Sequence, residues 1–335
     1  MKAFATLFLC ILFVATPCSH ATEGRLLIVD SAQGPPYEEL RESMLTELEQ
    51  LGFVSGRNLS VSHWSLGNEN GLAKRVWREE KDNEYDVIFL NGTVAAINFY
   101  RFAYNRPPYR FIFGAVTDPV GVGLIDGFEL PPPGNFTGIC YPVKLEERLR
   151  FVTETMPDAR NIGYIYADMP QSQSYKKWLT AALASPEFSH LTFHFRKVPF
   201  VKGEGGSRRM ATLAKPFIKE LDPVVDLFLS PNDQMGVQQS FARIVAETAT
   251  KPLVGLGLKD VMSGQGATMA IYPSMEASGK LAARMIYELL KGTDIKKIPP
   301  QYPPYGVAFD LKKAESFHLT IPEYLILQAG GNILR

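Results

Sequence analysis

Hydroxyl, amide, carboxylate and phenol groups gather in short segments that each follow an apolar run of the sequence. The segments are Ser31-Ala32-Gln33, Asn91-Gly92-Thr93, Thr117-Asp118-Pro119, Tyr166-Ala167-Asp168, Ser230-Pro231-Asn232-Asp233 and Tyr272-Pro273-Ser274. Few basic side chains accompany them. Groups of this kind form directed hydrogen bonds, and without basic partners they suit a neutral or zwitterionic small molecule better than a phosphate.

One set of residues in or near these segments is predicted to bind such a molecule. The set is Ser31, Tyr37, Asn91, Thr93, Thr117, Asp118, Tyr166, Tyr175, Asp233 and Tyr272. Its tyrosines offer stacking surfaces for an apolar or aromatic group. Asp233 could accept hydrogen bonds from an ammonium group, and the hydroxyls near helix N-termini could hold a carboxylate. The alternative is structural: the tyrosines pack in a core, and Asp233 caps a helix that begins at Gln234.

The sequence offers little support for catalysis or for a metal site. It contains no Gly-x-Ser-x-Gly elbow and no His-Glu-x-x-His or paired-cysteine spacing. His190 and His194 flank a segment with strand character, so they would not share a helical face. A hydrolase would need a histidine beside its nucleophile, and no polar segment above holds one. We therefore expect no enzyme activity, metal or cofactor.

Ser278-Gly279-Lys280 resembles part of a phosphate-binding loop. The full motif needs a glycine where Ser274 stands, and a serine or threonine where Leu281 stands. We therefore do not expect a phosphate site at this position.

Apolar β-rich runs alternate with amphipathic helical patterns along the chain. Strands are expected over 26–29, 59–64, 87–90, 111–113, 162–166, 191–198, 227–229, 253–256 and 268–271, and helices over 38–51, 143–156, 173–184, 207–220 and 275–291, among others. Fully apolar strands between helices predict parallel sheets covered on both faces. The pattern restarts after Pro131-Pro132-Pro133, which indicates two lobes. Open parallel sheets bind ligands at the carboxyl ends of their strands, where the polar segments lie.

The composition narrows the class of protein. The chain has 335 residues, with 35 Lys and Arg balancing 35 Asp and Glu, and 46% of its residues are hydrophobic. A net charge of zero argues against a nucleic-acid partner and against attraction to anionic membranes. The apolar fraction is enough to build a buried core in each lobe.

Residues 1–21 have the pattern of a secretory signal peptide. Lys2 precedes the apolar run Ala3 to Ala15, and Ser19-His20-Ala21 offers small residues at the cleavage positions. We expect cleavage after Ala21. A membrane anchor would need a longer apolar run, and lipidation at Cys18 is disfavoured by the proline before it. Cleavage would leave Cys140 as the remaining cysteine and exclude an internal disulfide.

The segment Thr-Asp-Pro-Val-Gly-Val-Gly-Leu at 117–124, followed by Gly-Asn-Phe-Thr-Gly at 134–138, resembles a family signature. The family is that of ABC-transporter substrate-binding proteins, including the tryptophan-binding lipoproteins of Gram-positive bacteria. Met156-Pro157-Asp158-Ala159 and Pro231-Asn232-Asp233 extend the resemblance. Pro132-Pro133-Gly134 departs from the usual R-P-G-G stretch. No lipid attachment site is evident, which fits a free periplasmic protein.

The resemblance implies a type I periplasmic binding protein fold, an α/β architecture of two doubly wound parallel-sheet lobes joined by a hinge. The expected lobes are 22–137 with part of 273–302, and 138–272 with 303–335. The hinge is expected near Gly138, Tyr272-Pro273 and Pro303-Pro304.

The implied function is that of a monomeric periplasmic solute-binding protein of an ABC-type uptake system. It would close on a small molecule, for example an amino acid, and dock on a membrane permease. The alternative is a ligand-sensing subunit for a membrane histidine kinase.

Overall fold

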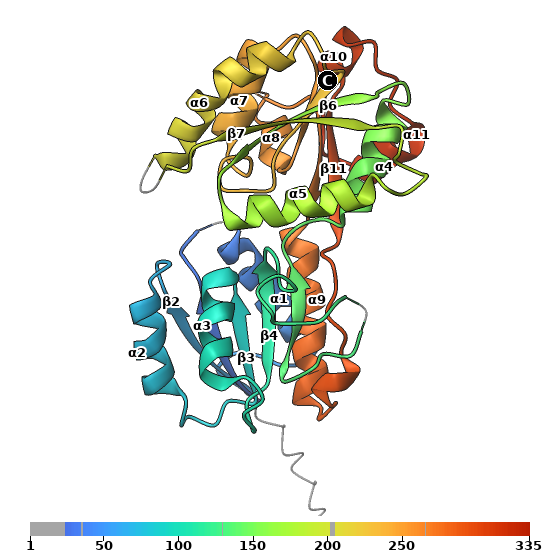
Figure 1. Ribbon diagram of the computed structural model, residues 1–335. Helices are drawn as coiled ribbons and strands as arrows, with labels where there is room; N and C mark the ends of the chain where they lie inside the picture. Colours follow the sequence, from blue (N-terminus) through green and yellow to red (C-terminus); the bar gives the residue numbers. More distant parts are fainter. Residues whose placement is uncertain (1–23, 35, 129, 202–204, 265) are drawn as a thin grey trace, which may run out of the picture.

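The computed structural model describes all residues except 1–23, 35, 129, 202–204 and 265. The expected signal peptide and its cleavage site therefore lie outside the described residues. Figure 1 shows two lobes stacked end to end, which we call the N-lobe and the C-lobe. Within the described part, no helix has the length and hydrophobicity that a bilayer crossing requires.

The N-lobe is a parallel sheet between two layers of helices. Its elements are β1 (Gly24–Asp30), α1 (Tyr37–Gln50), β2 (Leu59–Ser65), α2 (Asn70–Glu80), β3 (Val87–Asn91), α3 (Thr93–Ala103), β4 (Phe111–Val116), β5 (Phe136–Cys140) and, from later in the chain, α9 (Met275–Leu290). The strand order is β2-β1-β3-β4-β5, with every pair parallel. Helices α1 and α9 cover one face, and α2 and α3 cover the other.

The C-lobe repeats this plan with a larger sheet. Its elements are α4 (Leu145–Thr155), β6 (Asn161–Ala167), α5 (Pro170–Ala182), β7 (Thr192–Val198), α6 (Gly206–Leu221), β8 (Leu227–Leu229), α7 (Gln239–Thr248), β9 (Leu253–Gly255), α8 (Leu258–Met262), β10 (Met269–Pro273), β11 (Tyr305–Asp310), α10 (Leu311–Ser316), α11 (Glu323–Ala329) and β12 (Ile333–Leu334). A short 3-10 helix, η1 (Ile295–Lys297), follows α9. The order is β12-β11-β10-β9-β8-β6-β7, and β10 and β11 are antiparallel.

The central strands are buried from end to end. Every residue of β3, β4, β8 and β9 is buried. Full burial of a Val, Leu, Ile or Phe side chain contributes roughly 1.5–3 kcal/mol, so these strands supply much of the stability of each lobe. The prediction of parallel sheets covered on both faces is confirmed, apart from the antiparallel β10–β11 pair.

The chain passes between the lobes at three places. They are residues 141–144 between β5 and α4, Ser274 between β10 and α9, and 298–304 between η1 and β11. The second directly follows the expected Tyr272-Pro273, and the third includes the expected Pro303-Pro304. Helix α9 returns to the N-lobe, where it packs along α1 (Figure 1).

The first hinge was expected near Gly138, and the crossing lies a few residues later at 141–144, because Gly138 itself lies inside β5. Strand β5 was not expected, and it extends the N-lobe sheet past residue 137 to Cys140. Gly138 has a φ of 154°, and a Cβ there would lie 2.0 Å from the carbonyl oxygen of Phe113. This glycine therefore permits the close approach of β4 and β5, and the interlobe crossing begins only at Tyr141.

Candidate functional site

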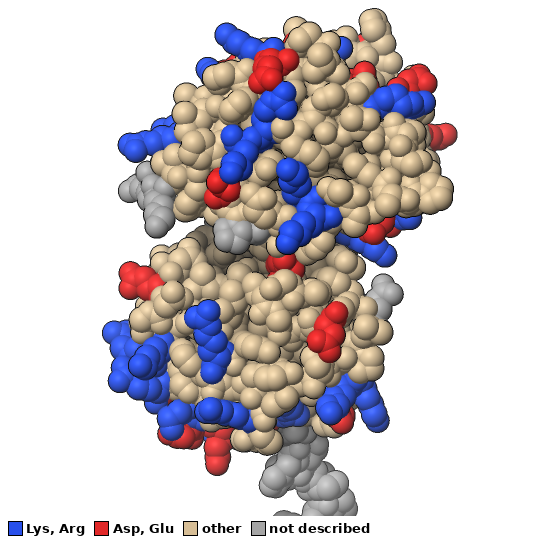
Figure 2. Space-filling model, viewed as in Figure 1, with Lys and Arg blue, Asp and Glu red and all other residues tan. Residues whose placement is uncertain are grey.

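The carboxyl ends of strands from both sheets meet at the boundary between the lobes. In the N-lobe, β3 and β4 point toward the C-lobe (Figure 1). In the C-lobe, α8 begins just after β9, and the Nζ of its Lys259 lies 4.0 Å from the Oε1 of Glu39 in α1. Figure 2 shows a hollow between the two lobes, with basic and acidic side chains intermingled on the visible face. This boundary is the candidate ligand site.

The N-lobe side of the site is built around the N-terminus of α3. The Oγ of Ser31, which follows β1, accepts a hydrogen bond of 3.0 Å from the N–H of Ala95. The Oγ1 of Thr93 accepts one of 3.2 Å from the N–H of Thr117, which follows β4. The structure therefore brings the predicted residues Ser31, Thr93 and Thr117 together, with Thr93 and Thr117 half-buried at the edge.

Gly92 and Tyr37 complete this edge. Gly92 precedes α3 with a φ of 100°, and a Cβ at this position would lie 2.5 Å from the ring of Tyr37. A glycine is therefore required between β3 and α3, which explains the Asn-Gly-Thr sequence. The ring of Tyr37 is half-buried beside the candidate site.

Asn91 is fully buried and has a local partner. Its Nδ2 donates to the Oδ1 of Asp30 and to the carbonyl oxygen of Tyr37, both at 2.9 Å. Arg41 of α1 forms an ion pair with Asp30, and His63 Nε2 lies 2.8 Å from Asp30 Oδ2. Burial and the charge of Arg41 lower the pKa of His63. This cluster fixes α1 on the sheet, and no spacing in the sequence indicates it.

Asp118 forms a turn with its own neighbours. The residue is buried, and its Oδ1 accepts a 2.7 Å hydrogen bond from the N–H of Gly121. A carboxylate that accepts a backbone N–H three residues ahead stabilises a local turn. The Thr-Asp-Pro-Val-Gly sequence therefore shapes the segment after β4.

Asp233 has a structural role, as the alternative to ammonium binding proposed, but it caps a turn at residues 234–237, because the helix expected from Gln234 begins only at Gln239. Its Oδ2 accepts from Ala167 N–H at 2.8 Å and Ser172 Oγ at 3.0 Å, and its Oδ1 from Met235 N–H at 2.9 Å and Gly236 N–H at 3.0 Å. Burial raises its pKa against the effect of these bonds. A carboxylate has about four acceptor positions, so a ligand ammonium would have to displace one of these partners.

Three predicted tyrosines of the C-lobe are buried in its core. Tyr175 stacks on Tyr164 with ring centres 6.2 Å apart, and Tyr166 packs in the same cluster. The hydroxyl of Tyr272 accepts a 3.0 Å hydrogen bond from Asn332 Nδ2. These rings show the packing role considered as the alternative, and Tyr37 stays the predicted aromatic group at the edge.

Tyr141 is an aromatic residue at the boundary that the sequence reasoning missed. It begins the crossing from β5 to α4. Burial and then the nearby groups Asp260, Tyr37 and Glu39 raise its pKa, and these neighbours come from both lobes. The cue to it in the sequence was its position directly after a strand, and that strand, β5, was not expected.

A second missed group is the guanidinium of Arg148, which is fully buried in α4. Its Nη1 donates to the hydroxyl of Tyr175 at 2.8 Å, and its Nη2 donates to the carbonyl oxygen of Ser230 at 3.1 Å. The Nε of Arg148, the Oγ of Ser230 and the Nδ2 of Asn232 are buried without a hydrogen-bond partner. We call these three residues the donor cluster. Ser230 and Asn232 follow the carboxyl end of β8, on the ligand side of the sheet.

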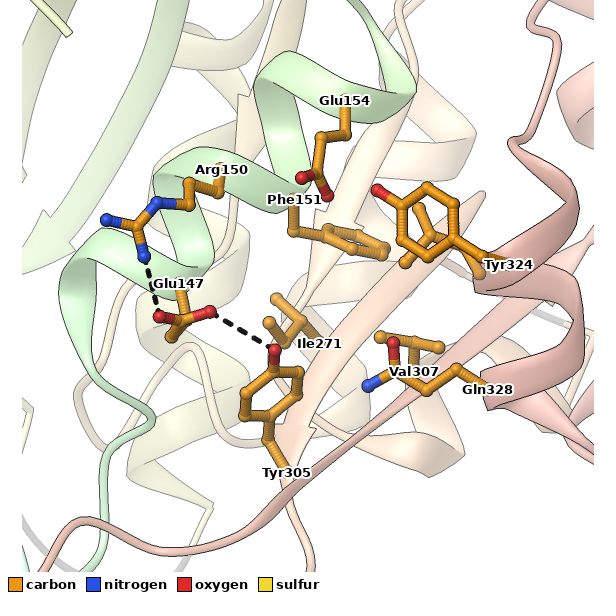
Figure 3. Close-up of a pocket in the computed structure, with 10 residues that line it drawn as sticks. Glu147, Arg150, Phe151, Glu154, Ile271, Tyr305, Val307, Tyr324 and Gln328 are labelled. Carbon is orange, nitrogen blue, oxygen red and sulfur yellow. Dashed lines mark hydrogen bonds and ion pairs between the residues drawn. The ribbon is translucent and has the colours of Figure 1, made fainter. Parts of the chain in front are cut away.

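A separate cavity of about 110 Å³ lies on the flank of the C-lobe, between α4, α11 and the start of β11 (Figure 3). Glu147 accepts hydrogen bonds there from Tyr305 at 3.2 Å and from Arg150 at 2.7 Å. None of the predicted ligand-binding residues lines this cavity. Among the described residues, no group of three or more His, Cys, Asp or Glu side chains is placed to hold a metal ion.

Comparisons with known proteins agree with this geometry. The tyrosine-binding protein of Clostridioides difficile strain R20291 is 24% identical over 268 residues, which cover 79% of this chain and 72% of the relative. A ligand-free, open substrate-binding protein with adhesive properties from Clostridium difficile superposes with a TM-score of 0.73 at 17% identity, covering 93% of this chain and 98% of the other. A Streptococcus pneumonia ABC domain in complex with L-Trp gives 0.69 at 18% identity, covering 93% and 100%.

The fold is therefore that of the type I periplasmic binding proteins, as expected. A family model described as ABC transporter substrate binding protein matches residues 27–198, from β1 through β7. The match spans the signature at 117–138, most of the N-lobe and the beginning of the C-lobe. The chain belongs to the family of ABC transporter substrate-binding proteins.

Proposed function

We propose that this substrate-binding protein captures a free amino acid with an apolar or aromatic side chain between its lobes. The observation that carries the proposal is the meeting of polar strand-end segments from both sheets at the lobe boundary, in a chain of this family. The tyrosine-binding relative and the L-Trp complex are both similar to this chain and support an aromatic amino acid.

The residues at the boundary suit such a ligand. Tyr37 and Tyr141 supply aromatic surface beside half-buried hydroxyl groups of Thr93 and Thr117. An aromatic side chain gains from stacking on tyrosine, and hydroxyl and amide groups can orient its polar end. Ligand contacts with both lobes at once would stabilise the closed form over the open one.

We also propose the steps of transport before and after ligand binding. We infer export through the signal peptide at residues 1–21, release of a mature chain that begins at Thr22, and docking of the closed form on a membrane permease. Mass spectrometry of the exported protein tests the cleavage position. The alternative is a sensory subunit for a histidine kinase, and the family match favours transport over it.

Calorimetric titration and thermal shift of the mature protein test the ligand class. The panel is L-tyrosine, L-tryptophan, L-phenylalanine and L-leucine, with ribose as the neutral comparison. We expect an aromatic amino acid to bind, and at a hundred times its Kd to stabilise the protein by about 2.7 kcal/mol. Tight binding of ribose with no response to any amino acid would contradict the proposal.

Two tyrosine variants give the test a control. Tyr37→Ala should weaken amino-acid binding by about five- to tenfold, the range of one aromatic contact. Tyr324→Ala removes an exposed ring from the separate flank cavity and should leave affinity unchanged. Equal losses in both variants would point to a global effect on the fold.

A further inference from the structure

Arg148 is a buried cation without an anionic partner among the described residues. It is fully buried, and none of the ion pairs in the described part of the chain includes it. Its two hydrogen bonds go to neutral oxygens, on Tyr175 and Ser230, and its Nε has no partner. A charge removed from water is normally paired, so this guanidinium is poised for an anion.

The other two members of the donor cluster lie beside it. Arg148 Nη2 reaches the carbonyl oxygen of Ser230, whose Oγ is unpartnered. Asn232 is held close by because its backbone N–H donates to Tyr164 at 3.2 Å, and Tyr164 stacks on the Tyr175 that Arg148 contacts. Buried polar atoms in native proteins are nearly all hydrogen-bonded, and three of the six unpartnered side-chain atoms among the described residues belong to these linked residues, so a ligand group would supply the partners they lack.

The nearest acidic group cannot serve this role. Asp233 lies close to Arg148, because the charges of both residues act on the pKa of Tyr164. The charge of Asp233 raises that pKa and the charge of Arg148 lowers it. Its oxygens, however, already accept from Ala167, Ser172, Met235 and Gly236. Because those bonds hold the segment after β8 in place, Asp233 is not free to neutralise the guanidinium.

The chemistry of the donor cluster fits a carboxylate. A guanidinium presents N–H groups in a planar fork that matches the two oxygens of a carboxylate, and an amide N–H and a hydroxyl can complete the donors. The N-lobe edge offers the hydroxyl donors of Ser31 and Thr93, but its nearby guanidinium, Arg41, is already paired with Asp30. Arg148 also lies in the first turn of α4, directly after the crossing at 141–144.

We propose that Arg148, with Ser230 and Asn232, binds the carboxylate of the ligand, so that the C-lobe holds its anionic end. This inference rests on the proposed function, since it names the residues that bind the carboxylate of the amino acid. It also reverses the expectation that hydroxyls and helix N-termini of the N-lobe hold the carboxylate.

The test compares each ligand with its neutral amide in wild type and variants. The probes are L-tyrosine with L-tyrosinamide and L-tryptophan with L-tryptophanamide, titrated calorimetrically. Arg148→Gln should weaken amino-acid binding by about 30- to 100-fold and amide binding by less than about threefold, because it removes a charge-assisted pair that only the acid forms. Arg148→Lys should weaken amino-acid binding by an intermediate factor, because an ammonium group keeps the positive charge but lacks the planar pair of N–H donors of a guanidinium.

Arg150→Gln is the matched control on the same helix. Arg150 is partly exposed and pairs with Glu187, with Nε 2.7 Å from Oε1. Its loss should leave both affinities unchanged. If wild type binds the amino acid and Arg148→Gln keeps the full preference for acid over amide, the inference is wrong while the proposed function stands. If no amino acid binds wild type, the proposed function itself fails.

A measurement on wild type covers the case in which the Arg148 variants do not fold. In protein labelled with nitrogen-15 arginine, the Nε–H signal of Arg148 should shift when L-tyrosine or L-tryptophan saturates the protein. It should shift much less with the corresponding amide. An unmoved Nε–H signal in the saturated complex would overturn the proposal.

Discussion

At the scale of single residues, two carboxylates of the C-lobe, Asp260 and Asp226, have pKa values shifted in opposite directions. Asp260 is buried in α8, and its Oδ2 accepts from Leu256 N–H at 3.0 Å and Gly257 N–H at 2.9 Å. Burial raises its pKa to about 6, against the effect of these two bonds. The folded state therefore binds a proton that the unfolded state has already lost above its ordinary pKa of 3.8.

The raised pKa of Asp260 makes the folded protein less stable as pH rises. A folded-state pKa above the unfolded one contributes stability that is complete below pH 3.8 and is lost as pH rises through about 6. Asp260→Asn keeps an oxygen for both N–H groups and does not titrate. Its free energy of unfolding, relative to wild type, should rise by about 2 kcal/mol between pH about 4.5 and 7. Guanidinium denaturation at the two pH values measures this difference.

Asp226 supplies a control with the opposite shift. Burial acts to raise its pKa, but hydrogen bonds from the N–H groups of Arg160 and Asn161, both 2.8 Å, and the charge of Lys251 outweigh it, so the pKa is lowered. The stability it contributes is present above its unfolded pKa and is lost only as pH falls below that value. The difference between Asp226→Asn and wild type should stay nearly constant over the same pH range. A common pH trend in both variants would contradict the assignment to Asp260.

At the scale of elements, the contact between α1 and α9 depends on one glycine. A Cβ on Gly279 in α9 would lie 2.5 Å from the carbonyl oxygen of Leu40 and 2.8 Å from the backbone nitrogen of Met44, both in α1. Backbone atoms cannot move aside as a flexible side chain can, so the helices approach this closely only with glycine. This contact explains Ser278-Gly279-Lys280 without a phosphate.

Gly279→Ala tests that contact. Alanine gains about 1 kcal/mol in helix propensity, but the overpacked interface should cost more, with a net loss of about 1–3 kcal/mol in the free energy of unfolding. Gly71→Ala in α2 is the control, because no atom lies within 4 Å of the Cβ it would add. That variant should gain about 0.5–1 kcal/mol. Equal behaviour of the two variants in denaturant titrations would show that α1 and α9 can separate without cost.

At the scale of the whole molecule, three crossings link two independently packed lobes. Each lobe has its own hydrophobic clusters on both faces of its own sheet. We therefore expect the lobes to rotate about residues 141–144, 274 and 298–304 while both sheets stay intact. Such a rotation would bring the half-buried edge at Thr93 and Thr117 toward the donor cluster.

Small-angle scattering measures this closure. The radius of gyration of the mature protein should fall when L-tyrosine or L-tryptophan saturates it, because both lobes contact the ligand only in the closed form. Ribose added at the same concentration should leave the radius unchanged. An unaltered radius in a complex that calorimetry shows to be saturated would exclude closure by lobe rotation.

Much of the architecture could be predicted from local patterns, because those patterns reflect local physics. An apolar run such as Leu26 to Val29 can be buried only in a sheet covered on both faces, and Leu40, Met44 and Leu48 form one helical stripe whatever surrounds them. Strand β5 was not predicted, because the need for glycine at position 138 arises from the close approach of the β4 backbone, which no local pattern shows.

The sequence by itself determined the two lobes, the alternation of strands and helices, the family and the strand-end location of the candidate site. The tertiary structure decided which polar groups there are free. Asp233 looked available but is occupied by donors from β6 and α5, whereas Arg148 looked like one residue of an amphipathic helix and is buried without an anion. The reason is physical: burial and hydrogen-bond partners come from segments far apart in the chain, and their positions are set only when the sheets assemble.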